Sequence, residues 1–308
     1  MSEELGLSSS ALRREVRALQ GQGYEIEVHP LWGIRLIAAP DRMLKREIRY
    51  GLRTHTIGRE MYCYDRMAST NDVAVRLAIA GAVEGTTVVA ERQTRGRGRL
   101  GRTWHSPAGR GLWVSWIFRP AKDPSMQEVG MGVGIAVVHV LRRMVGLDVG
   151  LKWPNDVVVH NRKIGGILGE IGSDRSGGSF VVLGLGLNVN QQQGEFPDEI
   201  RGRATSLRIE TGRDHHRVRL LQRIMEEIED TYAAVCLGDS MALEWKGLCS
   251  TLGKRVRVYL GERTVVGRAV DLRSDGALII EGDDGEREEV SAGELTGAVE
   301  VGRSSNEG

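Results

Sequence analysis

The chain has few cysteines, and none of them are closely spaced. Only Cys63, Cys236 and Cys249 occur among the 308 residues, without a Cys-x-x-Cys motif. Disulfide frameworks and thiolate zinc sites need several cysteines at characteristic spacings. We therefore expect neither, and we expect no tightly bound metal. This cysteine usage fits a reducing cytoplasm.

Long apolar runs and a strong net charge are also missing. The longest apolar stretch, residues 130–141, is too short to cross a bilayer, and the N-terminus has no apolar segment typical of a secretion signal. The formal net charge is +1, so no global field attracts nucleic acid or a membrane. The sequence predicts a cytoplasmic protein without a membrane partner, in which local arginine clusters bind any anion.

Glycine, by contrast, is abundant. The 41 glycines indicate many turns and places where the backbone approaches a ligand. Apolar residues make up 41% and charged residues 27%, as in a globular protein. The length suffices for a catalytic domain and one or two small modules.

Residues 1–39 form the first predicted unit. A helix with apolar residues at helical spacing presents a basic opposite face, and residues 24–28 and 33–37 follow as two short strands. This order resembles a winged helix-turn-helix, although a small helical lid with a solvated basic face explains it equally well. Because the chain begins at Met1 inside the motif, we expect a shortened domain. The candidate DNA-binding residues are Arg13, Arg14 and Arg17.

Residues 40–59 are predicted to be a linker with one short helix around residues 44–52. From 60 to 250, strands and helices alternate, which indicates an α+β or α/β domain. Helical stripes begin at Val73, Val133 and Val218. The predicted strands are residues 86–91, 112–118, 151–160, 164–171 and 180–189.

From residue 251 the pattern changes to short strands separated by glycine turns. Residues 255–260, 264–272, 277–281 and 287–290 alternate without a long helix between them. We predict a small SH3-like β barrel over 251–301. The polar tail, 302–308, is predicted to be disordered.

The sharpest local motif is GRGRLGR at residues 96–102, which follows a predicted strand. Glycines allow backbone N–H groups to approach an anion, and arginines supply forked donors. An RNA-binding segment rich in Arg and Gly has a similar composition. Its position between a strand and the aromatic residues Trp104–Trp116 favours a folded site.

Three further segments are candidates. Lys152 begins KWPND within a predicted strand pair, where a buried ammonium is costly unless it meets an anion, and where Pro154 must interrupt the ladder. An edge-strand bulge whose lysine extends to solvent explains the same residues. Ser69-Thr70-Asn71 precedes a helix and fits either an N-cap or a compact hydrogen-bonding surface. Gly184 and Gly186 lie in an apolar strand, which indicates close approach of a ligand or of another element.

The order of these motifs is more specific than any one of them. STN, then Gln93 with GRGRLGR, then KWPND followed by RKIGGIL at 162–168, then GLGLNVN resemble the catalytic domain of bacterial biotin protein ligases. The C-terminal unit resembles theirs, and the N-terminal unit is similar to the DNA-binding domain of members that also repress the biotin operon. The resemblance implies an α+β fold with a mixed sheet like that of class II synthetases.

The resemblance also implies a reaction. Biotin would attack the α-phosphate of ATP to form biotinyl-5′-AMP, and a lysine of the biotin carboxyl carrier protein of acetyl-CoA carboxylase would take the biotinyl group. Lys152 and Arg99 are the catalytic candidates, because cations stabilise the charge on phosphorus and retain the adenylate. Mg²⁺ would accompany ATP, with Asp156 as a candidate partner. The implied biotin and adenylate residues are Ser69, Thr70, Asn71, Gln93, Arg97, Gly98, Arg99, Arg102, Lys152, Gly184, Gly186 and Asn188.

Operator DNA and a ligand-promoted homodimer are further partners that the resemblance implies. Two alternatives remain open from the residues. One is a biotin-sensing repressor without ligase activity, which would not need Lys152 and Arg99 together. The other is a lipoate ligase, whose RRxxGGG-type motif is not found in this chain.

Overall fold

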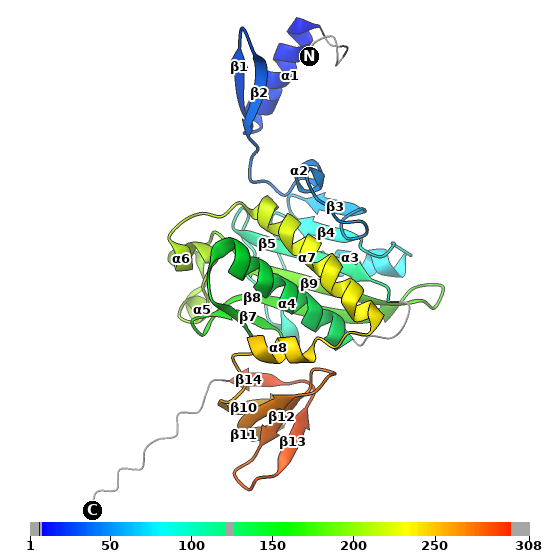
Figure 1. Ribbon diagram of the computed structural model, residues 1–308, viewed down its shortest axis with the longest axis vertical. Helices are drawn as coiled ribbons and strands as arrows, with labels where there is room; N and C mark the ends of the chain where they lie inside the picture. Colours follow the sequence, from blue (N-terminus) through cyan, green and yellow to red (C-terminus); the bar gives the residue numbers. More distant parts are fainter. Residues whose placement is uncertain (1–5, 7, 121–125, 297–308) are drawn as a thin grey trace, which may run out of the picture. The chain divides into compact units, whose positions relative to one another are not determined.

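The computed structural model describes Gly6 and residues 8–120 and 126–296, and the chain divides into two compact units, Met1–Arg42 and Met43–Gly308. Figure 1 shows their elements. Among the described residues, no helix is long and apolar enough to cross a membrane.

The first unit is one helix and one antiparallel strand pair. Helix α1 spans Ser9–Gly21 and is capped by the Ser8 side chain, while β1 (Glu25–His29) pairs with β2 (Gly33–Ala38). These elements confirm the predicted helix and hairpin. The helix that a winged helix-turn-helix would place earlier falls on residues outside the described ranges, so this assignment stays a prediction.

The second unit is built on a seven-stranded mixed sheet, and the predicted mixed sheet is confirmed. Strands β3 and β4 run parallel, and every other neighbouring pair is antiparallel. In sheet order the strands are β3 (Met61–Tyr64), β4 (Thr87–Ala90), β5 (Gly111–Phe118), β9 (Ser179–Asn188), β8 (Arg162–Ser173), β7 (Asp156–Val159) and β6 (Val149–Lys152).

Helices cover both faces of this sheet. Helices α4 (Met126–Val145) and α7 (Arg217–Leu237) lie side by side over one face (Figure 1). Helix α3 (Thr70–Ile79) packs on residues such as Val88 and Val182. Their neighbours along the strands, such as Val89 and Leu183, belong instead to the main core. Since alternate strand residues point to opposite faces, α3 covers the other face.

The short helix predicted around residues 44–52 is present, but residues 43–59 pack against the second unit instead of forming a free linker. This stretch contains α2 (Lys45–Arg49), and Met43, Ile48 and Ile57 are buried in the main core. The carboxylate of Glu229 accepts hydrogen bonds from the backbone N–H groups of residues 55–57. Apolar side chains in a polar-looking stretch therefore make it part of the second unit.

The predicted strand over 151–160 is two strands. Lys152 at the end of β6 pairs with Asp156 at the start of β7, and the turn between them contains a cis Trp153–Pro154 bond. Pro154 thus interrupts the ladder as predicted, but the chain reverses there. Short helices that the sequence did not reveal are α5 (Asp198–Arg201), α6 (Leu207–Thr211) and α8 (Ala242–Leu248).

The C-terminal strands form a separate antiparallel sheet. The four predicted strands are present as β10 (Arg255–Leu260), β11 (Arg263–Leu272), β12 (Leu278–Glu281) and β13 (Arg287–Val290), and β14 (Glu294–Thr296) was not predicted. The Trp153 indole donates to the carbonyl of Gly276, 3.0 Å away, which joins this sheet to the KWPND turn. Closure into an SH3-like barrel stays a prediction, and the predicted tail lies outside the described residues.

One buried ion pair anchors the second unit. Arg217 at the start of α7 donates to Glu91 after β4, and the same carboxylate accepts from the backbone N–H groups of Met43 and Gly109. Burial alone would raise the pKa of Glu91, but the guanidinium and the two N–H groups outweigh it and hold the pKa below its usual value.

Replacing Arg217 by methionine is expected to destabilise the protein by about 3–5 kcal/mol at pH 7, because a buried carboxylate loses its counterion. The lowered pKa of Glu91 in the wild type contributes stability above the unfolded pKa, and this contribution disappears as the pH falls. In the variant, burial would raise the pKa of Glu91. The difference between the two urea midpoints should therefore narrow as the pH falls, beginning above the usual glutamate pKa, where Glu91 of the variant becomes protonated, and continuing until Glu91 of the wild type is protonated as well.

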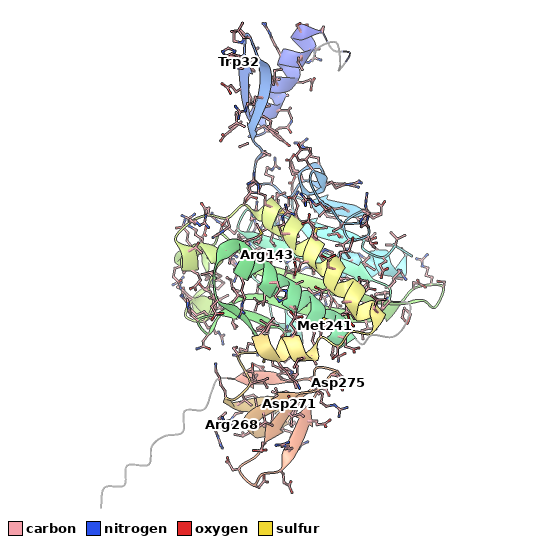
Figure 2. The ribbon with its side chains drawn as sticks, in the orientation of Figure 1. Trp32, Arg143, Met241, Arg268, Asp271 and Asp275 are labelled. Atoms are coloured by element: carbon pink, nitrogen blue, oxygen red, sulfur yellow. The ribbon has the colours of Figure 1, made fainter. Side chains whose placement is uncertain are left out.

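Arg143 on α4 provides the matched control (Figure 2). Its side chain is 61% exposed and pairs with Glu227. Arg143→Met should lower the free energy of unfolding by less than about 1 kcal/mol. An equal loss in both variants, or a loss for Arg217→Met that does not depend on pH, would contradict the anchoring role.

Candidate functional site

A cavity of about 540 Å³ opens beside the centre of the sheet. Its walls come from the start of α3, the loop after β4, the turn between β6 and β7, strands β8 and β9, and the segment before β14. Every residue that the resemblance implied lines it, namely Ser69, Thr70, Asn71, Gln93, Arg97, Gly98, Arg99, Arg102, Lys152, Asp156, Gly184, Gly186 and Asn188. Segments more than 100 residues apart in the chain thus meet at one site.

The STN triplet is both an N-cap and a polar surface. The Ser69 side chain caps α3, while Thr70 and Asn71 are buried against Ser115 of β5. The Ser115 hydroxyl lies 2.8 Å from Thr70 Oγ1 and 2.6 Å from Asn71 Oδ1, and Thr70 Oγ1 lies 3.1 Å from Gln93 Oε1. Three contacts share two hydroxyl protons, so the group is rich in acceptors.

Gln93 is held in one orientation. Its Oε1 accepts from the Thr70 backbone N–H at 2.8 Å, and its Nε2 donates to Ser106 Oγ at 2.9 Å. The Ser106 hydroxyl in turn lies 3.1 Å from the carbonyl oxygen of Trp104. Gln93 therefore presents a fixed amide to the cavity.

The two glycines of β9 make room for side chains of the site. A Cβ at Gly184 would collide with Asn71 Oδ1, and a Cβ at Gly186 would collide with the Trp104 indole. The close approach predicted for this strand is therefore an approach of neighbouring side chains, which themselves line the cavity.

The Gly/Arg loop is folded back on itself. Arg97 bridges to Thr103, the Gly98 N–H donates to the Arg102 carbonyl, and Leu100 adopts a left-handed conformation with φ of 55°. Arg102 forms an ion pair with Glu294 of the C-terminal sheet. The loop is thus tied to β14, a strand that the sequence did not predict.

The arginines of this loop differ in their partners. Arg97 contacts the carboxylates of Glu170 and Asp72, whereas Arg99 donates only to the Asn155 amide oxygen among the contacts of the described residues. Burial lowers the pKa of Arg99, and the nearby Asp156 carboxylate partly opposes this shift. Arg99 therefore combines a half-buried cation with no ion-pair partner in the described chain, which suits an anionic ligand.

Two lysines line the cavity. Lys163 Nζ lies 2.5 Å from Asp156 Oδ1 and 5.2 Å from the centre of the Trp104 ring. The backbone of Lys152 pairs with that of Asp156, but its ammonium makes no hydrogen bond or ion pair with the part of the chain that the structure describes. The Asp156 carboxylate, expected to bind Mg²⁺, is thus neutralised by Lys163. Among the described residues, no cluster of three acidic, histidine or cysteine side chains could hold a metal.

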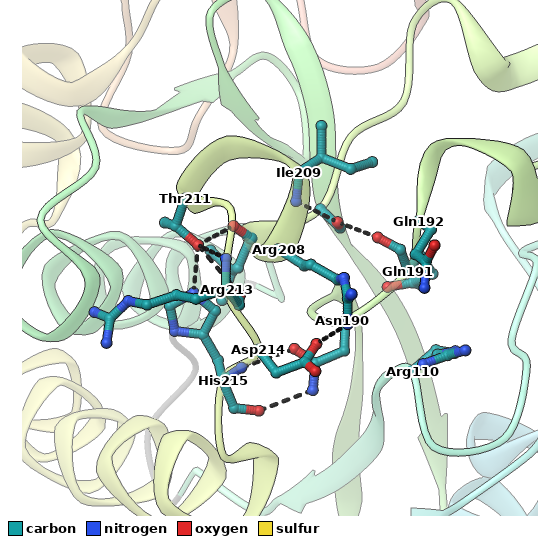
Figure 3. Close-up of polar contacts among 12 residues, drawn as sticks. Arg110, Asn190, Gln191, Gln192, Arg208, Ile209, Thr211, Arg213, Asp214 and His215 are labelled. Carbon is teal, nitrogen blue, oxygen red and sulfur yellow. Dashed lines mark hydrogen bonds and ion pairs between the residues drawn. The ribbon is translucent and has the colours of Figure 1, made fainter.

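A buried polar network supports Asn188. Its Nδ2 donates to the Thr205 carbonyl, and its Oδ1 accepts from Gln191 Nε2, which is fully buried. The next residues continue the network, as Figure 3 shows: Asn190 exchanges hydrogen bonds with the backbone of His215. This network fixes the wall of the cavity next to residues 196–204.

Sequence reasoning missed several residues of the site. Lys163 and Trp104 line the cavity, whereas Ser115, Glu170 and Glu294 act through neighbours, although Glu294 also lines it. Lys163 belongs to the RKIGGIL segment that follows KWPND, so its positive charge beside that motif is the available signal. The others carry no local pattern, because only the strand pairing brings them to the site.

Two parts of the chain match known protein families. Residues 63–188 match the biotin/lipoate A/B protein ligase family, and residues 251–295 match the C-terminal domain of biotin protein ligases. The bifunctional ligase/repressor BirA of Bacillus subtilis is 35% identical over 297 residues, covering 95% of this chain and 91% of the relative. The biotin–[acetyl-CoA-carboxylase] ligase of Mycobacterium tuberculosis is 33% identical over 72% of this chain and 84% of its own.

Solved structures agree with this assignment. The biotin protein ligase from Aquifex aeolicus in complex with biotin and ATP has a TM-score of 0.68 and 31% identity, covering 77% of this chain and 98% of that one. The chain belongs to the biotin protein ligase family. The family predicted from the order of the motifs is confirmed.

Replacing Gly184 by alanine is expected to displace Asn71, because the new Cβ would occupy the position of its Oδ1. Overpacking of this kind costs about 1–3 kcal/mol, which thermal unfolding can measure. Gly194→Ala is the control, since no atom lies within 4 Å of a Cβ there. Equal melting temperatures for both variants would show that Asn71 is free to move.

Proposed function

We propose that the protein is an ATP-dependent biotin protein ligase that forms biotinyl-5′-AMP and transfers biotin to a lysine of a biotin carboxyl carrier protein. The observation that carries the proposal is that residues from each of the motifs converge on one cavity in a chain of this family. Relatives of this chain are named for this ligation and were solved with biotin and ATP.

The acceptor-rich group at one end of the cavity fits the ureido ring of biotin. Three contacts among Thr70, Asn71, Ser115 and Gln93 share two protons, so an N–H group of a ligand would supply the missing donor. A ureido ring brings two N–H donors and one carbonyl acceptor. Apolar walls such as Val114 and Leu185 suit the rest of the bicyclic ring.

Cations at the other end fit the adenylation step. The biotin carboxylate and the α-phosphate of ATP are both anions, and Lys152 would lie between them and cancel their repulsion. The same ammonium would stabilise the charge of the pentacoordinate transition state. Mg²⁺ enters with ATP as part of the substrate and would assist the departure of pyrophosphate.

The second step needs no nucleophile of the enzyme. The ε-amine of the carrier lysine would attack the acyl carbon of the mixed anhydride, and AMP would leave. Arg99 and the folded Gly/Arg loop would exclude water until the carrier docks. Its half-buried guanidinium, which lacks a carboxylate partner in the described chain, supports this role.

The two lysines allow a direct test of the adenylation role. Lys152→Met should reduce pyrophosphate release with biotin and ATP by about 10²–10³-fold, as for the loss of one preorganised charge. The exposed Lys45→Met is the control for an added methionine. Retained activity in Lys152→Met together with loss in Lys163→Met would transfer the role to Lys163. Release with lipoate in place of biotin would overturn the choice of substrate.

Arg99→Gly is expected to keep adenylation but to release the intermediate, so that bystander lysines become labelled. Arg95→Gly, an exposed position of the same loop outside the cavity lining, is the matched control. The measurement is biotin incorporation into an unrelated protein, detected by avidin blotting. Strict carrier selectivity with normal adenylate retention would disprove the shielding role.

A second function is repression of a biotin operon. Arg13, Arg14 and Arg17 are exposed on α1, and relatives of this chain are named ligase/repressor. We propose that this face contacts the phosphates of operator DNA, in a ligand-promoted homodimer. Binding of an operator fragment that depends on biotin and ATP, and that weakens in Arg13→Ala/Arg17→Ala, would support it. Unchanged binding in the variant would contradict it.

A further inference from the structure

Arg97 lies in the Gly/Arg loop but is not available as a free cation. Its Nη2 lies 2.5 Å from Glu170 Oε1 in β8 and 2.8 Å from Asp72 Oδ1 in the first turn of α3. Two carboxylates neutralise one guanidinium, so a further anion would gain little from it. The contacts make Arg97 a tie between the loop and the body of the unit.

The same oxygen of Glu170 orients Asn71. Asn71 Nδ2 donates to Glu170 Oε1 at 2.9 Å and to the Leu168 carbonyl at 3.2 Å, so both of its hydrogens are used. Its Oδ1 must then face Ser115. The opposite amide orientation would place Oδ1 against two acceptors. Glu170 thereby determines that the oxygen of the Asn71 amide, and not its nitrogen, faces Ser115.

We propose that Glu170 is a positioning residue that couples the Gly/Arg loop to Asn71 of the acceptor-rich group. It holds Arg97 on one side and sets the amide of Asn71 on the other, with one carboxylate oxygen. Glu170 does not line the cavity, so it acts through these two residues. The inference rests on the proposed function, because it assigns Asn71 to biotin and the loop to the adenylate.

Two substitutions separate the two contacts. Glu170→Gln keeps an oxygen acceptor for Asn71 but loses the charge that holds Arg97, whereas Glu170→Leu loses both. Because Asp72 still contacts Arg97, Glu170→Gln should raise the rate of adenylate escape by roughly three- to tenfold, with the KM for biotin nearly unchanged. Glu170→Leu should in addition raise the KM for biotin about tenfold.

Asp174→Asn is the matched control. Asp174 follows the same strand and pairs with Arg119 at 2.7 Å, away from the cavity. This variant should match the wild type in adenylate escape and in KM. If Glu170→Gln behaved like Asp174→Asn, the coupling would be refuted. In an Arg97→Gln background, Glu170→Gln should add less than about twofold, and independent multiplying effects would also refute it.

Trypsin provides a readout that needs no activity. Cleavage after Arg97, Arg99 and Arg102 should be faster in Glu170→Gln than in Asp174→Asn, since the loop loses one tie. Equal cleavage rates would overturn the proposal even if the ligase assay failed.

Absence of pyrophosphate release by the wild type would refute the proposed function alone. If Glu170→Leu did not fold, Glu170→Gln alone and Glu170→Gln in the Arg97→Gln background would still test the coupling between Glu170 and Arg97.

Discussion

The carboxylate of Glu91 is the constraint on which the site depends. It lies between β4 and the Gly/Arg loop, and it accepts from Gly109 at the other end of that loop segment. Arg217, the first residue of α7, neutralises it inside the core, and Met43 donates its N–H to it. One buried charge therefore fixes both ends of the glycine-rich segment between Glu91 and Gly109.

Within that frame, the site separates its polar groups by charge. Neutral acceptors gather around Ser115, and the cations Lys152 and Arg99 lie on or contact the turn between β6 and β7. A molecule with a neutral ring and a carboxylate tail has the same polarity along its length. The arginines follow this division, because Arg97 is neutralised beside the neutral end and Arg99 is not.

The C-terminal sheet takes part in this arrangement. Glu294 contacts Arg102 of the loop, and the Gly276 carbonyl accepts from the Trp153 indole in the KWPND turn. The Gly/Arg loop and the KWPND turn are thus each held by the small sheet as well as by the main one. This gives a physical reason for the sheet to accompany the catalytic unit, since a loop rich in glycine and arginine is costly to order by itself.

The sequence by itself determined the family, the mixed sheet, the main helices and the motif residues that line part of the cavity, because these depend on local periodicity and on the order of motifs. Only the tertiary structure decided which residues support them. The polar-looking stretch 43–59 buries Met43, Ile48 and Ile57 in the main core. Lys163 meets Asp156 across a strand pair, and Glu170 reaches both Arg97 and Asn71. Such contacts join positions up to about 170 residues apart, and no local pattern encodes them.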